Sequence, residues 1–334
     1  MNDRPTPSSS AVPRPAPGRA LTTTETAART PHAALVDALR RAAIELAQGR
    51  IACPPRQAVA MGEGTLLSMV ASAPDITVHK LATVVPANPA RGLPTIQGHV
   101  DVLDSATGAS LLRLDAATLT GRRTAALSML GIEAFAPARP PACVLVIGTG
   151  AQALQHVLAL RALHPAARIE ILGRTHEATA RFCAAHGLQG AHLQTHADAP
   201  TTANAAYATA LHPVARVEDS RADVVITCTT SRTPVYAAPA SPARLLIATG
   251  AYQADAAEIA PDTVRACHAY VDEPDGALHE AGDLIAVGID WNAVRPLAAA
   301  LERPEEVPRG SAPILFKTVG CAAWDLAAAR VALA

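Results

Sequence analysis

Residues 142–153 have the sequence ACVLVIGTGAQA, and this stretch decides the fold class of the chain. Its run of Val, Leu and Ile has the length and composition of a buried strand, and it ends at Gly148-Thr149-Gly150. Apolar residues at helical spacing follow directly, and residues 168–172 then form a second strand-like run. A glycine turn between a strand and a helix, followed by another strand, is typical of a dinucleotide-binding unit.

The glycine turn assigns positions to a bound dinucleotide. Gly148 suits the tight turn, Gly150 lets backbone N–H groups approach a pyrophosphate, and Ala153 keeps the helix close to the strand. The positive end of the helix then faces the phosphates. We therefore expect five consecutive residues to bind the cofactor: Gly148, Thr149, Gly150, Ala151 and Gln152.

The end of the second strand predicts which dinucleotide is bound. An NAD-binding unit usually has Asp or Glu there, which accepts hydrogen bonds from the ribose hydroxyls. This chain has Gly173-Arg174-Thr175 instead, and a guanidinium beside a hydroxyl suits a 2′-phosphate. Glu170 lies inside the strand, so we interpret it as a lateral strand residue. NADPH is the expected cofactor, with NADH bound at lower affinity, and the alternative for Arg174 is an ordinary solvated loop charge.

Composition excludes several classes of function. The chain has 334 residues, of which 50% are hydrophobic and only 3% aromatic, and its formal net charge is −1. That charge gives no support to a nucleic-acid partner or an anionic membrane partner. The six cysteines include no CxxC pair and the histidines no HExxH spacing, so we expect no metal site. No apolar stretch reaches the ~20 residues that span a bilayer, and no secretory signal is recognisable, so we expect a cytoplasmic protein with free thiols.

The rest of the chain divides by composition and periodicity. Residues 1–30, rich in Pro, Ser, Thr and Ala, are predicted to be a disordered leader. Residues 35–46 have the apolar spacing of an amphipathic helix. Residues 56–116 are strand-like and include a hairpin of residues 97–103 and 109–114. The further expected elements are a helix from about Thr120, strands at 224–228, 245–249 and 268–271, and a last helix at 321–333.

Two adjacent arginines are predicted to lie at the start of a helix. Thr120 suits an N-cap, which would place Arg122 and Arg123 in the first helical turn, where the helix dipole disfavours cations. Two cations beside free backbone N–H groups indicate a site for an anion. We assign the ligand role to Arg123 and expect Arg122 to extend into solvent.

Lys80 lies in the middle of a strand-like run, where it shares a face with Val78 and Ala82 by two-residue alternation. A lysine on such a face is either at an exposed edge or buried opposite an anion, and the pattern alone does not decide between them. His79 points to the opposite face and is interpreted as structural. Arg56 is a loop arginine to which the pattern assigns no role.

Five motifs resemble the ornithine cyclodeaminase/mu-crystallin family, over residues 35–334. They are GLPTIQG (92–98), LTGRRTAA (119–126), GTGAQ (148–152), EAGD (280–283) and FKTVG (316–320). The resemblance implies an α/β fold in which a Rossmann-type NAD(P)-binding domain, residues 134–309, is inserted into a discontinuous α+β domain. That second domain, residues 31–133 and 310–334, would bind substrate and form a homodimer.

The resemblance also implies roles for individual residues. Arg56, Lys80 and Arg123 match the family positions that bind the substrate carboxylate, and Lys80 is the expected catalytic residue. Thr124 and the Val319-Gly320 turn match cofactor-side positions near the nicotinamide.

Two departures separate this chain from the cyclodeaminases of the family. Those enzymes carry an acid at the position of Gly173, and at the position of Tyr252 an Asp that acts as a base in the ammonia-releasing steps. Asp255, three residues further on, is interpreted as a helix cap. Reduction of a preformed cyclic imine needs no such base, because a protonated iminium requires only hydride at carbon. The chain therefore resembles the Δ1-pyrroline-2-carboxylate/Δ1-piperideine-2-carboxylate reductase (ketimine reductase) branch.

That branch implies NADPH-dependent reduction of cyclic imino acids to L-proline and L-pipecolate. The carboxylate clamp would orient the substrate, and the proton would come from water or from Lys80, a choice that the sequence leaves open. The alternatives are an ornithine or lysine cyclodeaminase that uses NAD+, an alanine or N-alkyl amino acid dehydrogenase, and a non-catalytic mu-crystallin-like binding protein.

Overall fold

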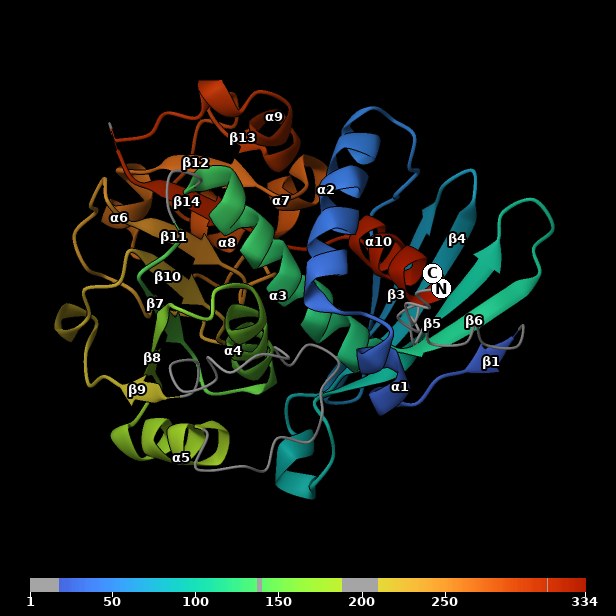
Figure 1. Ribbon diagram of the computed structural model, residues 1–334, viewed down its shortest axis with the longest axis horizontal. Coiled ribbons are helices and arrows are strands. Elements are labelled where there is room, and N and C mark those ends of the chain that lie inside the picture. The colour runs from blue at the N-terminus through green and yellow to red at the C-terminus, as the bar shows by residue number, and fades with distance from the viewer. Residues whose placement is uncertain (1–17, 137–139, 188–209, 311) are drawn as a thin grey trace, which may run out of the picture.

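The computed structural model describes residues 18–136, 140–187, 210–310 and 312–334, which form two β-sheets lying side by side (Figure 1). The long helix α3 (Ala116–Phe135) contacts strands of both sheets, and α2 (His32–Ala47) packs along it. The two sheets are thus joined through a shared helical layer, and residues from either sheet can meet at its edge.

The larger sheet has eight parallel strands in the order β13-β12-β14-β11-β10-β7-β8-β9. The strands are β7 (Cys143–Ile147), β8 (Arg168–Leu172), β9 (Leu211–Pro213), β10 (Val224–Thr227), β11 (Leu245–Ala248), β12 (His268–Val271), β13 (Arg295–Pro296) and β14 (Ile314–Lys317). The strand order reverses between β7 and β10, and ligands of such sheets bind at this point, outside the carboxyl ends of the strands. The predicted Rossmann-type fold is confirmed.

Helices cover both faces of this sheet, as an all-parallel sheet requires. Val144 and Val146 of β7 belong to the core beneath α3 and α4 (Ala151–Leu163), whereas Leu145 and Ile147 belong to a second core on the opposite face. The helices that contribute to this second core are α6 (Pro261–Arg265), α7 (Pro274–Glu280) and α8 (Gly282–Ile285).

The smaller sheet has six strands in the order β1-β6-β5-β4-β3-β2. They are β1 (Arg19–Ala20), β2 (Gln57–Met61), β3 (Gly64–Ser72), β4 (Ile76–Val84), β5 (Ile96–Asp104) and β6 (Ser110–Asp115). Neighbours from β2 to β6 are antiparallel, and the predicted hairpin is confirmed as β5 and β6. Helix α10 (Ala322–Leu333) packs on β3 and β4 beside α2, so the end of the chain covers one face of this sheet (Figure 1).

The remaining described helices are short. They are α1 (Thr23–Ala28), α5 (His176–His186), α9 (Leu297–Glu302), η1 (Asn88–Arg91), η2 (Val217–Asp219) and η3 (Pro304–Glu306).

The disordered leader predicted for residues 1–30 is wrong in its second half. Strand β1 pairs with β6, and α1 begins at a capping box in which the Thr22 hydroxyl accepts from the backbone N–H of Glu25 and the Glu25 carboxylate accepts from that of Thr22. Thr22 and Glu25 form the S/T-x-x-E signature of a helix start, which the bias toward Pro and Ser obscured. Residues 1–17 lie outside the described residues.

Two further boundaries differ from the prediction. Strand β14 was expected in the second segment of the substrate domain, but it pairs with β11 and β12 inside the parallel sheet, because its apolar side chains are buried there on both faces. Helix α3 begins earlier than expected: its N-cap is Asp115, whose carboxylate accepts from the backbone N–H of Thr118 at 2.8 Å. Thr120 therefore lies inside the helix, and Arg122 and Arg123 lie beyond its first turn.

A search of the described part of the chain for a helix long and apolar enough to cross a membrane found none.

Candidate active site

A cavity of about 600 Å³ opens at the carboxyl ends of β7, β8 and β10. Five of the predicted cofactor residues line it: Gly148, Thr149, Gly150, Gly173 and Arg174. Thr229 and Thr230, which follow β10, form another part of its wall. The cavity therefore occupies the switch point of the sheet, where a dinucleotide binds in this fold.

The two glycines of the turn differ in their surroundings. Gly148 has φ +135°, and a Cβ there would lie 2.9 Å from the carbonyl oxygen of Cys228, so only glycine fits. Gly150 is the N-cap of α4, and a Cβ there would meet nothing within 4 Å. The space in front of the first N–H groups of α4 is thus open, as binding of a pyrophosphate requires.

Gly173, at the end of β8, is closely packed by two threonine side chains. A Cβ at Gly173 would lie 2.8 Å from both Thr149 Cγ2 and Thr179 Oγ1, and the Gly173 N–H donates to that Thr179 oxygen at 2.8 Å. Arg174 is exposed and lines the cavity directly beside this position. Thr175 follows Arg174, and its hydroxyl caps α5 by accepting from the Ala178 N–H at 3.1 Å.

Glu170 is a residue of strand β8, as predicted, and the structure shows that it is buried. Its carboxylate accepts from Ser220 Oγ at 2.6 Å and from Arg168 Nε at 3.0 Å. Because both oxygens are bound within the protein, Glu170 does not provide the missing ribose acceptor.

A second cavity, of about 200 Å³, lies between the two sheets and shares Cys228, Thr229 and Thr230 with the first. Arg56, which precedes β2, Lys80 of β4 and Arg123 of α3 all line it. The other predicted residues in its wall are Thr124, Gln152, Val319 and Gly320. The structure thus brings together three cations that are far apart in the sequence, beside the cavity that fits a dinucleotide.

The strand pattern left open whether Lys80 is exposed at an edge or buried opposite an anion, and the structure shows that it is buried. Its side chain is 5% exposed, and Nζ lies 2.8 Å from Asp325 Oδ2 and 3.4 Å from Thr120 Oγ1. Burial lowers the pKa of Lys80 to about 8, and the positive charges of Arg123 and Arg56 act in the same direction, whereas Asp325 raises it. This ammonium can therefore change protonation state close to neutral pH.

Arg123 lies against the Val319-Gly320 turn. Its Nε is 3.3 Å from Asp325 Oδ1, and a Cβ at Gly320, where φ is +75°, would lie 2.8 Å from its Nη1. Glycine at position 320 therefore permits both the left-handed turn and the close approach of the guanidinium. The prediction for Arg122 is wrong: it is buried and donates from Nε to the carbonyl oxygen of Thr30 at 2.8 Å, because its true helical position faces the core.

Arg56 is held by groups that sequence reasoning missed. Its Nη2 lies 2.8 Å from Glu280 Oε2 and donates to the carbonyl oxygens of Val319, at 3.0 Å, and Gly320. Burial raises the pKa of Glu280, although Arg56 acts against this. The EAGD motif contained Glu280, but nothing in the local pattern indicated its partner.

Asp272 fixes the Val319-Gly320 turn from behind. Its carboxylate accepts from the backbone N–H groups of Val319, at 3.0 Å, and Gly320, at 2.9 Å, and from Trp324 Nε1 at 2.9 Å. The turn and the start of α10 are thus tied to the end of β12.

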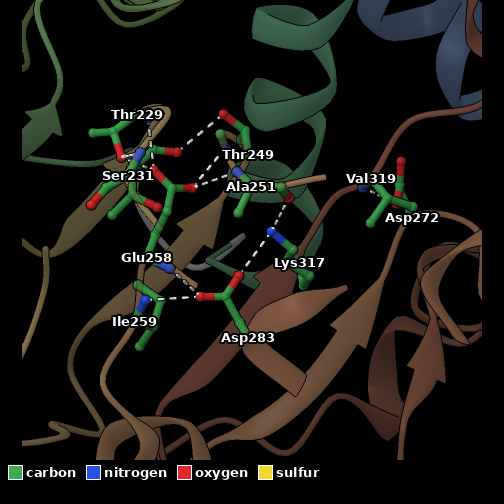
Figure 2. A network of polar contacts seen from close by, with 12 residues as sticks. Thr229, Ser231, Thr249, Ala251, Glu258, Ile259, Asp272, Asp283, Lys317 and Val319 are labelled. Carbon is green, nitrogen blue, oxygen red and sulfur yellow. Dashed lines mark hydrogen bonds and ion pairs between the residues drawn. The ribbon is translucent and has the colours of Figure 1, made fainter. Parts of the chain in front are cut away.

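A buried polar network supports the loops between the two cavities (Figure 2). Lys317 Nζ lies 2.9 Å from Asp283 Oδ2 and donates to the carbonyl oxygen of Ala251 at 2.5 Å. Glu258 accepts from the N–H groups of Thr229 and Gly250, both at 2.7 Å, while its own N–H donates to Asp283 at 2.6 Å. Asp283 and Lys317 come from the EAGD and FKTVG motifs, whose role is thus to fix backbone that lines the cavities.

Tyr252 projects from this fixed backbone into the wall of the second cavity. Burial is the main reason why its pKa is raised. Asp255 is exposed and pairs with Arg232 at 3.0 Å, so its expected role as a helix cap is wrong and it does not reach the cavity wall. A carboxylate therefore stands at neither position as a base for an amine substrate.

In the described ranges, no group of three or more His, Cys, Asp or Glu residues could hold a metal ion. The six cysteines are free thiols.

The fold and the paired cavities define a dinucleotide-binding protein of the Rossmann type with an adjoining cationic site. The model of the ornithine cyclodeaminase/mu-crystallin family matches residues 19–333, and the chain belongs to this family.

Named relatives are close over almost the full length. The chain is 48% identical over 309 residues to Delta(1)-pyrroline-2-carboxylate reductase 2 of Burkholderia ambifaria, covering 92% of this chain and 93% of the relative. It is 46% identical, with the same coverage, to the Delta(1)-pyrroline-2-carboxylate/Delta(1)-piperideine-2-carboxylate reductase of Azospirillum brasilense. Among solved structures, Delta(1)-pyrroline-2-carboxylate reductase of Thermococcus litoralis, in complex with NADH and L-proline, superposes with a TM-score of 0.80 at 22% identity, over 94% of this chain and 96% of that one.

Proposed function

We propose that this chain, an oxidoreductase, uses NADPH to reduce Δ1-pyrroline-2-carboxylate to L-proline and Δ1-piperideine-2-carboxylate to L-pipecolate. The observation that carries the proposal is the cluster of Arg56, Lys80 and Arg123 beside the dinucleotide cavity, of which Lys80 and Arg123 are buried. The 46–48% identity to reductases named for these substrates supports it.

The cation cluster fits a substrate carboxylate. Guanidinium groups bind carboxylates through paired N–H donors, and a buried ammonium adds a further donor. A carboxylate bound to these groups would hold the neighbouring C2 atom inside a cavity whose wall includes Thr229 and Thr230, which the two cavities share. The nicotinamide, when bound, supplies the hydride, and the contribution of the chain is chiefly to orient the imine carbon.

Lys80 is the proposed proton donor. Reduction of a neutral imine adds one hydride to carbon and one proton to nitrogen, so a group that holds a proton near neutral pH must face the substrate. Lys80 has such a pKa and lines the cavity. Its deprotonated form would be reprotonated from solvent through the cavity mouth.

NADPH is favoured over NADH by the geometry around Gly173. Gly173 offers no acidic side chain to the ribose hydroxyls, and a side chain there would require Thr149 or Thr179 to shift. The adjacent Arg174 has its guanidinium at the cavity wall, where a 2′-phosphate would bind. Residues 148–152 would hold the pyrophosphate.

The site lacks a base that the second candidate function, ornithine or lysine cyclodeaminase, would need. That reaction removes ammonia and needs a carboxylate where Tyr252 stands, and the nearest Asp along the chain, Asp255, is exposed and paired with Arg232. Direct reduction of an imine does not need this group.

We also propose that the chain forms a homodimer through the open face of the six-stranded sheet. Helices α3 and α10 cover one face, while Val59 and Val70 remain exposed on β2 and β3, at 55% and 38%. Exposed apolar side chains on a sheet are typical of an interface. Light scattering on the wild type and on Val70→Lys tests this: a dimer that the substitution weakens is expected, and a wild-type monomer contradicts it.

The functional proposal is tested by NADPH oxidation with a panel of substrates. Both cyclic imino acids should be reduced, and pyruvate with ammonia or methylamine should react much more slowly. Release of ammonia from L-ornithine with catalytic NAD+ would identify a cyclodeaminase instead.

A further inference from the structure

Asp325 is the anion that joins two members of the cation cluster. It lies in the first turn of α10, its side chain is 0% exposed, and each of its oxygens faces a different cation. Oδ2 is 2.8 Å from Lys80 Nζ, and Oδ1 is 3.3 Å from Arg123 Nε. One carboxylate from the end of the chain thus ties together β4 and α3.

The position of Asp325 is fixed by the structure around it. The preceding residue, Trp324, is fully buried and donates from Nε1 to Asp272, which also holds the Val319-Gly320 turn. A carboxylate in the first turn of a helix is further stabilised by the helix dipole. Asp325 therefore presents its oxygens to Lys80 and Arg123 from a rigid frame.

The charges around the cavity nearly balance. Three cations, Arg56, Lys80 and Arg123, face two carboxylates, because Glu280 pairs with Arg56 and Asp325 pairs with the other two. With these groups ionised, one positive charge remains among the directly paired groups. Asp272, behind the Val319-Gly320 turn, is bound instead by the two backbone N–H groups of that turn and by Trp324. A buried site of this charge is neutralised by a ligand with one negative charge, and a second negative charge would be left uncompensated.

We propose that Asp325 is a positioning residue that holds Lys80 and Arg123 in the substrate clamp and sets the cavity charge for ligands with a single carboxylate. The inference rests on the proposed function for the reaction itself, but the charge selectivity is a property of the cavity and is measured by binding alone.

Asp325 would then also be the group that keeps Lys80 protonated. The charged groups that face Lys80 are Asp325 from α10, Arg123 from α3 and Arg56 from the loop before β2. Only Asp325 among these favours the ammonium, so its removal lowers the pKa of Lys80. The alkaline limb of the pH profile of kcat/KM then moves to lower pH.

Asp325→Asn tests this with little change in shape, and Asp75→Asn is the matched control. Asp75 also pairs with α10, at 2.8 Å from Arg330, but it lies outside both cavity walls. In Asp325→Asn we expect kcat for pyrroline-2-carboxylate to fall at least about tenfold and the alkaline limb to move down by about one pH unit. Asp75→Asn should keep the wild-type limb, and Asp325→Glu should restore its position in part. An unchanged limb in Asp325→Asn overturns the proposal.

Charge selectivity is measured by calorimetry with two planar probes, pyrrole-2-carboxylate and pyrrole-2,5-dicarboxylate. The wild type should bind the monocarboxylate at least about tenfold more tightly, and Asp325→Asn should reduce or reverse this ratio. Equal affinities of the wild type for the two probes overturn the proposal. Because this measurement needs no variant, it tests the proposal even if Asp325→Asn does not fold. Selective binding by a protein that fails to reduce either imine would contradict the proposed function and leave the charge assignment intact.

Discussion

Replacing Arg174 by alanine tests the choice of cofactor. Arg174 lines the dinucleotide cavity, and no ion pair involves it among the residues that the structure describes, so a phosphate would not have to displace a partner. A hydrogen bond to a charged group contributes about 1.5–3 kcal/mol, and the exposure of Arg174 places it at the lower end because solvent screens the charge. A loss of about 1.5 kcal/mol corresponds to a roughly tenfold weaker interaction with NADPH.

The assay measures KM for NADPH and for NADH at saturating imine. Arg174→Ala should raise KM for NADPH roughly tenfold and change KM for NADH by less than about twofold, because NADH has no 2′-phosphate. Arg181→Ala is the matched control: Arg181 is an exposed arginine of α5 that pairs with Glu177 and does not line the cavity. Equal rises for the two cofactors, or the same effect in Arg181→Ala, would refute the assignment of a phosphate contact.

Four other predictions concern the buried lysines Lys80 and Lys317. Lys80→Met should lower kcat/KM for imine reduction by well over about tenfold while the protein remains folded by circular dichroism, and wild-type kinetics would remove Lys80 from the site. In the wild type, kcat/KM should be full at neutral pH and decline as pH rises through about 8, because Lys80 then loses its proton; a profile without a limb near that pH contradicts its role as donor. From the same lowered pKa, Lys80 should make folding stability rise between about pH 8 and its unfolded pKa, since the unfolded chain binds the extra proton there. Lys317→Met leaves Asp283 buried without its cation and should lower the free energy of unfolding in urea by about 3–5 kcal/mol, and a loss below about 1 kcal/mol would show that the network contributes little.

Local sequence signals predicted the parts of the molecule whose partners are close in the chain. The strand, glycine turn and helix around Gly148 and Gly150 are contiguous, and the same holds for the hairpin of β5 and β6. Gly148 meets a backbone constraint that only glycine satisfies, and Gly150 leaves its side-chain position open, so both can be interpreted without knowledge of the rest of the fold. The cofactor cavity could therefore be located from the sequence.

The interior of the substrate cavity could not be predicted in this way. Arg123 and Asp325 are 202 positions apart, and no periodicity links α10, the last helix, to α3. The two-residue alternation correctly placed Lys80 on an apolar face, but it did not indicate that Asp325 would be its anionic partner. The prediction for Arg122 failed for another reason: α3 is buried on almost all sides, and the local pattern around Arg122 did not indicate this.

The most direct test of the central claim is the stoichiometry and chirality of the product formed from Δ1-pyrroline-2-carboxylate and NADPH. A cavity that clamps a carboxylate through Arg56, Lys80 and Arg123 beside an NADPH site predicts one L-proline for each NADPH consumed. No consumption of NADPH with this imine, together with ammonia release from L-ornithine in the presence of NAD+, would contradict it.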